Sequence, residues 1–340
     1  MNVTTRAVLL VLLLCAAGAQ GVLRFYGSYQ EGFLSTYFRE SEPGVLFVGD
    51  LMLARAVEDR VREVGGEHFF DKVQTLHERA TLVVANFEAS MQEHHVRSPD
   101  FTFRFSVDAA LVPLLRRAHV THVSLANNHA DDFGVTARHY AEGVLERAGV
   151  VVFGTPRTLS ASSTTYITVG ESRVALIAIE AVFGNPYLDD VQRILADAGT
   201  QSEYQVIYIH WGEEYQPHHS AKQEALAHAL VSYGADAIVG HHPHVIQDIG
   251  SIEGVPVFYS LGNYVFDQYF DDAVSKGLAL MMYIRNHQLE FEIIPVATER
   301  SVPYVLDETV SKQILNELAH RSEKALRSDI VRGFVSHGAK

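Results

Sequence analysis

The segment GADAIVGHHPHVIQDI (residues 234–249) places three histidines around a proline, directly after an apolar run. That run, AIV, is typical of a strand covered on both faces. Pro243 fixes its own φ and disfavours helical backbone at the residue before it. We therefore expect extended chain through His242 and His244, with both side chains on one side and His241 facing the other way. Two convergent imidazoles indicate a metal site; loop histidines that only make hydrogen bonds are the alternative.

Polar side chains follow five further apolar runs in the same manner. The residues are Asp50 after VLFV, Asn86 and Glu88 after TLVVA, Asn127, Asn128 and His129 after THVSLA, His210 and Glu213 after YQVIYI, and Asn263 after VPVFYS. Ligands in open α/β sheets bind beyond the carboxyl ends of the strands, so these side chains should meet at one edge. We predict a metal site whose ligands are Asp50, Glu88, Asn128, His210, His242 and His244.

The predicted ligands supply carboxylate, amide oxygen and imidazole without any thiolate. This set suits Mn²⁺, Fe²⁺ or Zn²⁺, with Mg²⁺ as a further option, and it is large enough for one or two ions. Two neighbouring ions can activate a water molecule and bind both the attacking and the leaving oxygen of a displacement reaction. His129 is a predicted catalytic residue that could act as a general acid or stabilise developing charge, and Glu213 is a second catalytic candidate that could act as a base.

Five residues near the same edge are predicted to bind substrate: Arg55, Asn86, Arg104, His241 and Asn263. The two arginines could bind a carboxylate or a phosphate, or they could form surface salt bridges. Structural roles are also open for the ligand candidates. Asp50 could cap the following helix, Asn86 and Glu88 could be turn residues, and Asn127 and Asn128 could occupy a tight turn.

The first residues, MNVTTRAVLLVLLLCAAGAQG, have the layout of a secretory signal peptide with cleavage after Ala19. The apolar stretch is short for a membrane-spanning helix, and an uncleaved anchor is the alternative. Cys15 is the one cysteine of the chain, so a mature protein would contain neither disulfides nor thiolate metal sites. We expect an exported protein, periplasmic or extracellular.

The mature chain is strongly acidic. Removing Arg6 with the signal peptide leaves 26 of the 27 Lys and Arg residues against 41 Asp and Glu, a net charge of −15. Nucleic-acid binding needs a basic surface, so we exclude nucleic acid as a partner. A polyanionic substrate would have to be met by a local cation.

Strand-like runs alternate with helical patterns from Gly44 onward. This order predicts an α/β architecture whose largely parallel or mixed sheet is covered on both faces. We divide the chain into a signal peptide (1–19), a linker or N-terminal arm (20–43), one large domain (44–300) and a C-terminal helical tail (301–340). The tail contains an amphipathic pattern with Ile314, Leu315 and Leu318 on one face.

Six stretches together resemble the CapA family of poly-γ-glutamate capsule synthesis proteins: VGDLMLARAVED, VANFEAS, SLANNHADDFG, IHWGEEYQP, GADAIVGHHPHVIQ and VFYSLGNYVFDQ. They extend from about Val45 to Asp267. The resemblance implies a metallophosphatase-like four-layer α/β/β/α sandwich with mixed sheets. It also implies a role in capsule biosynthesis, with an anionic envelope polymer such as poly-γ-glutamate and membrane-bound synthesis proteins as partners.

The chain departs from the wider metallophosphoesterase pattern at three points. Met52 stands where that pattern has the histidine of Asp-x-His, Asn86 and Glu88 replace a bridging aspartate, and the histidine cluster has an extra residue. Two hypotheses follow. The protein is a metal-dependent hydrolase or transferase acting on an envelope polymer, or it is a non-catalytic accessory protein with a vestigial metal site.

Overall fold

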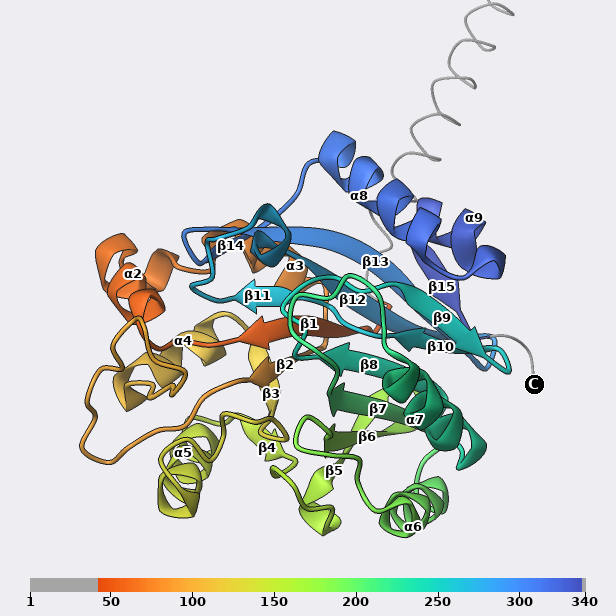
Figure 1. The fold of residues 1–340 in the computed structure, drawn as a ribbon, viewed down its shortest axis with the longest axis horizontal. Coiled ribbons are helices and arrows are strands. Elements are labelled where there is room, and N and C mark those ends of the chain that lie inside the picture. Colours follow the sequence, from red (N-terminus) through yellow and green to blue (C-terminus); the bar gives the residue numbers. More distant parts are fainter. Residues whose placement is uncertain (1–41, 338–340) are drawn as a thin grey trace, which may run out of the picture. The chain divides into compact units, whose positions relative to one another are not determined.

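The computed structural model describes residues 42–337 (Figure 1). The predicted signal peptide lies outside the described residues, and so does all of the predicted arm except residues 42 and 43. Among the residues described, no helix is long and apolar enough to cross a membrane.

The first sheet has a parallel half and an antiparallel half that meet at β1. Its strand order is β14-β13-β12-β1-β2-β3-β4, with β11 paired to β1 and β15 paired to β13. The parallel strands are β1 (Val45–Leu51), β2 (Leu82–Phe87), β3 (Val120–Ser124), β4 (Val151–Phe153) and β11 (Asn263–Val265). The antiparallel strands are β12 (Lys276–Arg285), β13 (Gln288–Glu299), β14 (Val302–Val305) and β15 (Phe334–Ser336).

The second sheet has the order β5-β6-β7-β8-β10-β9 and is also mixed. Its four central strands run parallel, and an antiparallel strand closes each side. The strands are β5 (Thr164–Val169), β6 (Ser172–Glu180), β7 (Tyr204–His210), β8 (Ala237–His241), β9 (Ile249–Ile252) and β10 (Val255–Phe258).

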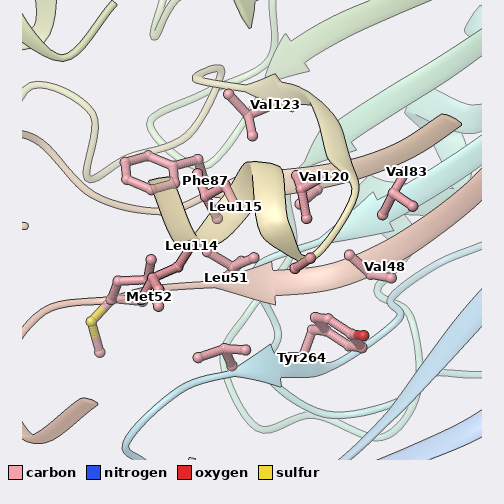
Figure 2. Packing of buried hydrophobic residues seen from close by; sticks show 14 of the residues in the cluster. Val48, Leu51, Met52, Val83, Phe87, Leu114, Leu115, Val120, Val123 and Tyr264 are labelled. Atoms are coloured by element: carbon pink, nitrogen blue, oxygen red, sulfur yellow. The ribbon is translucent and has the colours of Figure 1, made fainter. Parts of the chain in front are cut away.

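Helices cover the outer faces of the two sheets. The first sheet carries α2 (Ala56–Val64), α3 (Gln74–Glu78), α4 (Val112–Arg117) and α5 (Val135–Arg147), and the second carries α6 (Leu188–Gly199) and α7 (Ala221–Ser232). Figure 2 shows Leu114 and Leu115 of α4 packed against side chains of β1, β2 and β3. The helices α8 (Glu308–Arg321) and α9 (Arg327–Val331) contribute instead to the core between the sheets.

Strand periodicity explains the layers. Val45 and Phe47 of β1 point into the core between the sheets, whereas Leu46 and Val48 point into the core beneath the helices. A strand with both faces buried must be apolar at every position, as this one is up to Val48. The result is the predicted four-layer α/β/β/α sandwich with two mixed sheets, and this prediction is confirmed.

The residues predicted as a helical tail, 301–340, contain more than helices. Two strands from this region, β14 and β15, pair with β13 and extend the first sheet. Ile314, Leu315 and Leu318 of α8 are buried in the core between the sheets.

Both ends of the described chain lie at the same edge of the first sheet. β1 begins there at Val45 and ends at the opposite edge with Leu51. β15 pairs with the start of β13, near the hairpin that joins β12 to β13, and this hairpin is at the edge where β1 begins. The carboxyl ends of the parallel strands, where a site is expected, are therefore remote from both chain ends.

Candidate metal centre

Side chains from both sheets meet at the carboxyl ends of the strands. Asp50 lies in β1, Glu88 directly follows β2, and His210 ends β7. One ligand atom from each lies within 4.8 Å of the others, and we call these residues the first triad. A second triad with the same spacing is formed by Glu88, His242 and His244. Every member is buried, and Glu88 is common to both.

Glycine allows the loop before β11 to approach β1 closely at this edge. A Cβ atom on Gly49 would lie 2.0 Å from the carbonyl oxygen of Gly262. Any larger residue would force the loop away from the strand. With glycine present, Asp50 donates its backbone N–H to Gly262, and Asn263 is brought level with Asp50.

Glu88 is completely buried, and within the described chain neither of its carboxylate oxygens has a hydrogen-bond donor. Its Oε1 lies 3.7 Å from Nε2 of His244 and 3.9 Å from Nε2 of His210. Burial and the charge of Asp50 raise the pKa of Glu88 well above its usual value. A buried carboxylate without donors is unfavourable unless a cation meets it, so these residues fit a divalent metal ion.

Asp50, by contrast, is surrounded by donors. It accepts hydrogen bonds from Nδ2 of Asn86 at 2.8 Å and from the backbone N–H of His242 at 3.2 Å. Nδ1 of His244 lies 3.2 Å from its Oδ2. Burial alone would raise the pKa of Asp50, but its contacts with His241 and His244 hold it well below the usual range.

Amide side chains hold His210 in place. Nδ2 of Asn86 lies 3.0 Å from Nδ1 of His210, and Oδ1 of Asn128 lies 2.7 Å from Nε2 of the same ring. Asn127 in turn donates to Oδ1 of Asn86 at 3.2 Å. Burial, together with the charge of His242, lowers the pKa of His210 well below its usual value, so this imidazole is neutral.

The backbone of the GHHPH loop differs from the prediction. His242 and His244 have φ of 96° and 58°, so the chain is left-handed at both residues rather than extended. Their rings still converge, with centroids 5.8 Å apart. His241 does not face away: its Nδ1 is 3.6 Å from Oδ1 of Asp50, and its ring packs on Tyr208. The hydrogen bond from His242 N–H to Asp50 helps to hold the loop in this conformation.

A chain of hydrogen bonds determines which nitrogen of His244 faces the centre. Asn263 donates through Nδ2 to Oε1 of Gln268 and to the carbonyl of Val274, so its Oδ1 is the acceptor toward His244, at 3.0 Å. Nδ1 of His244 therefore carries the proton, and Nε2 faces Glu88. Gln268 also donates to the hydroxyl of Tyr215 at 3.0 Å. Burial lowers the pKa of His244, but the charges of Glu88 and Asp50 outweigh it and raise the pKa to about 9.

His129 faces the same centre from the loop after β3. Its Nε2 lies 3.7 Å from Oε1 of Glu88, and its Nδ1 lies 3.0 Å from Oδ2 of Asp132. Phe105 packs its ring on the imidazole at 4.1 Å between centroids and donates its backbone N–H to Asp132. Asp132 thus orients His129, as an acidic partner orients a catalytic imidazole.

Comparison with known proteins identifies the family. Residues 44–268 match the family model described as "Bacterial capsule synthesis protein PGA_cap". The chain belongs to the PGA_cap family. The match includes both triads and His129, and the predicted resemblance is confirmed.

Two relatives support this assignment over most of the chain. The "PGA biosynthesis protein CapA" of Bacillus subtilis (strain 168) is 28% identical over 297 residues, which cover 82% of this chain and 78% of the relative. The "Capsule biosynthesis protein CapA" of Bacillus anthracis is 28% identical over 296 residues, covering 81% and 72%. The first name places that relative in PGA biosynthesis, and the second name places the other in capsule biosynthesis.

A solved structure supports the fold. A Staphylococcus aureus protein described as a "Putative 5'-Nucleotidase" superposes with a TM-score of 0.50 at 14% identity, covering 85% of this chain and 58% of that one. At this identity the likeness concerns the fold alone, and the fold is that of the metallophosphatases.

Four of the five residues predicted to bind substrate are buried in this PGA_cap protein. Asn86 and Asn263 hold the ligand side chains, and His241 is completely buried beside Asp50. Arg55 makes a bidentate pair with Asp267, donates to the carbonyl of Thr102, and lies over the ring of Phe105. Arg104 is exposed at the surface.

Glu213 does not reach the centre. It is exposed and lines a separate surface cavity of about 550 Å³, together with Lys222 and Gln223. The charge of the next residue, Glu214, adds a smaller contribution to the raised pKa of Glu88, after burial and Asp50, and to that of His244, after Glu88 and Asp50.

Sequence reasoning assigned no role to Asp132 or Gln268. Asp132 lies three residues after His129, and the two occupy a single turn, so their spacing could have indicated the pair. Gln268 acts through Asn263 from a loop with no periodicity, and no pattern in the sequence indicates it.

A third group of candidate ligands lies elsewhere, at Glu58, His95 and Asp108. Arg62 pairs with both carboxylates, and His95 lies 3.1 Å from Glu58. The guanidinium already supplies the cation that this group needs.

Proposed function

We propose that this PGA_cap protein is a metal-dependent hydrolase or transferase that acts outside the cytoplasm on poly-γ-glutamate or a related envelope polymer. The observation that carries the proposal is Glu88, a fully buried carboxylate that finds no donor within the described chain and is shared by two triads. The name of the Bacillus subtilis relative, a PGA biosynthesis protein, supports the polymer, and that of the Bacillus anthracis relative supports a role in capsule biosynthesis. The predicted signal peptide supports the location.

The two triads would hold two ions. Asp50, Glu88 and His210, with Oδ1 of Asn128 beside His210, would bind one. Glu88, His242 and His244 would bind the other, with Glu88 between them. When bound, such ions supply Lewis acidity and lower the pKa of water.

The protein's own residues would move the proton. Nδ1 of His129 is held by Asp132, and Nε2 faces the centre, so the protonated ring can donate a proton to a leaving atom. The ring of Phe105 covers the imidazole and limits its contact with water. Asn127 accepts a hydrogen bond from the backbone N–H of His129 and keeps the turn in place.

One observation favours the alternative, a non-catalytic accessory protein. Met52 occupies the position of a histidine in the wider metallophosphoesterase pattern. Its side chain is completely buried in the core beneath the helices, and its sulfur accepts the N–H of Ala54. Position 52 therefore contributes no ligand.

Elemental analysis tests the metal site. We expect near-stoichiometric Mn, Fe or Zn in the purified protein and none in a His242→Ala/His244→Ala variant. A His94→Ala/His218→Ala variant is the matched control, because it removes two exposed histidines and should keep the metal. Absence of metal from the wild-type protein, even after incubation with each ion, would contradict the proposal.

Activity separates the two functions. The metal-loaded protein should cleave or transfer chains of poly-γ-glutamate, and His129→Ala should lose this activity while keeping its metal. If the loaded wild-type protein acts on neither a γ-glutamyl polymer nor a phosphodiester, the accessory role is the better description.

A further inference from the structure

Arg104 is held in a fixed orientation on the surface. Its Nε donates to the carbonyl oxygen of Asp132 at 2.9 Å, and one Nη group donates to the same oxygen. The guanidinium carbon lies 4.3 Å from the ring centroid of Phe133. Because stacking and hydrogen bonds already restrict the side chain, little rotamer entropy remains to be lost when a ligand binds.

This guanidinium is connected to the metal centre by two short routes. Asp132, which accepts its hydrogen bonds, also binds His129. Phe105, the next residue in the chain, packs its ring on the same imidazole. Arg104 therefore lies close to the proposed proton donor, with Asp132 and Phe105 each in contact with His129.

The charge of Arg104 is not neutralised by a carboxylate of the described chain. The other arginines of the loops after β1 and β2 are paired, Arg55 with Asp267 and Arg97 with Asp59 and Asp100. Within residues 42–337, the polar contacts of the Arg104 guanidinium are to a backbone carbonyl only. In a chain with a net charge of −14, this is the kind of local cation that an acidic substrate requires.

Two exposed aromatic rings lie on the same loop. Phe101 and Phe103 are 85% and 77% exposed, although both neighbouring segments are anchored. Arg55 donates to the carbonyl of Thr102 at 2.8 Å, and the backbone N–H of Phe105 donates to Asp132 at 2.7 Å. A rigid loop that holds large apolar side chains in water offers a surface for apolar groups of a ligand.

We propose that Arg104, stacked on Phe133, is a carboxylate-binding subsite close to His129 and the metal centre. In this subsite Phe101 and Phe103 contact the methylene groups of the same ligand. The ligand class is an acidic polymer with carboxylates spaced along an aliphatic chain. This inference rests on the proposed function for the polymer, and it assigns the residues that select it.

Binding of defined γ-linked glutamate oligomers to the metal-loaded full chain tests the subsite, with affinity measured calorimetrically at several salt concentrations. Arg104→Ala should weaken binding at least tenfold and reduce its salt dependence, whereas Arg104→Lys should give an intermediate loss. Phe101→Ala/Phe103→Ala should weaken binding several-fold without changing the salt dependence. All variants should keep the wild-type metal content.

Arg173→Ala is the matched control. Arg173 also stacks on an aromatic ring, that of Tyr166 at 4.3 Å. It lies at the start of β6 in the second sheet, whereas the other end of this strand is level with His210. Its substitution should change the affinity less than twofold.

Several outcomes would overturn the inference. The subsite would be excluded if Arg104→Ala and Arg173→Ala reduced the affinity for the oligomer equally. If these variants still processed the polymer, the proposed function would stand. Equal affinity for an oligomer with amidated carboxylates, or tighter binding of a glycerol-phosphate oligomer, would exclude a carboxylate subsite. Binding that depends on Arg104 but is not followed by turnover would support the subsite and contradict the enzymatic function. If the wild-type protein did not bind the acidic oligomer at all, both proposals would be wrong.

Discussion

His210 and His244 both face Glu88, yet the protein holds them by different means. His210 ends a regular strand, level with His241 in the neighbouring strand, and amide side chains fix its ring. His244 lies in a loop with left-handed backbone, and its ring is fixed by Asn263 of β11, which is held in turn by Gln268 in the loop after that strand. The ligands of the first triad thus lie on or directly after strands of the two sheets, whereas both histidines of the second triad lie in one loop.

This difference has a physical consequence. Hydrogen-bonded register holds the ends of β1 and β2 in the first sheet and the end of β7 in the second, so each of these strand ends can move little within its own sheet. Loops have fewer such constraints and are generally more mobile. We therefore expect the second triad to be the more easily perturbed by substitutions that touch no ligand.

The largest expected effect is at Glu88, which both triads share. Glu88→Gln should reduce bound metal to below about a tenth of the wild-type content, because each ion loses its common carboxylate. Elemental analysis measures this effect. Retention of both ions would show that Glu88 is not shared.

Single histidine substitutions should distinguish the two triads. His210→Ala should lose one equivalent of metal and His244→Ala the other, whereas the double variant should lose both. Titration of each metal-free variant with Zn²⁺ counts the remaining sites. If either single variant loses both ions, the triads bind cooperatively and are not independent.

The pH dependence of the free energy of unfolding should also distinguish the two triads. The pKa of His244 is raised from 6.5 to about 9 in the folded protein, so its protonated form stabilises the metal-free fold below pH 6.5. This stabilisation is lost as the pH rises through 9. Denaturant unfolding of the metal-free protein should show the free energy of unfolding falling by up to about 3 kcal/mol between these pH values. His244→Asn should flatten this slope, and an unchanged slope would exclude His244 as its source.

The smallest expected effect is at Gln268, which touches no ligand. Gln268→Ala should weaken binding of one ion about tenfold by releasing Asn263, and it should leave the other ion unaffected. Gln313→Ala, in an exposed position of α8, is the matched control and should change neither. Equal weakening of both ions would mean that Gln268 supports the fold in general.

The sequence predicted the fold and the meeting of the polar residues for one reason. Apolar runs alternating with helical patterns specify parallel strands, and the carboxyl ends of such strands meet at one edge. Asp50, Glu88 and His210 are each brought to that edge by the end of a strand. That these residues bind metal stays a prediction.

Some features could not be predicted because they depend on contacts distant in the sequence. Arg55 was expected to bind substrate, but its partner Asp267 is 212 residues away. Pro243 restricts only its neighbours, whereas the left-handed conformation at His242 accompanies a hydrogen bond to Asp50 in another sheet. Glu213 lies beyond the end of β7, where the alternation of a strand no longer indicates which side chain faces inward.

The position of the two ends of the described chain makes residues 43 and 337 convenient points for attachment to a surface. Both lie at the edge of the first sheet where β1 begins, and Asp50, the sixth residue of β1, lies roughly 17 Å along the strand from Val45. A biosensor chip, an affinity bead or a fluorescent fusion partner joined at either residue would leave Arg104 and the metal centre open to solution. Long polymers could then be presented to the immobilised protein without obstruction from its support.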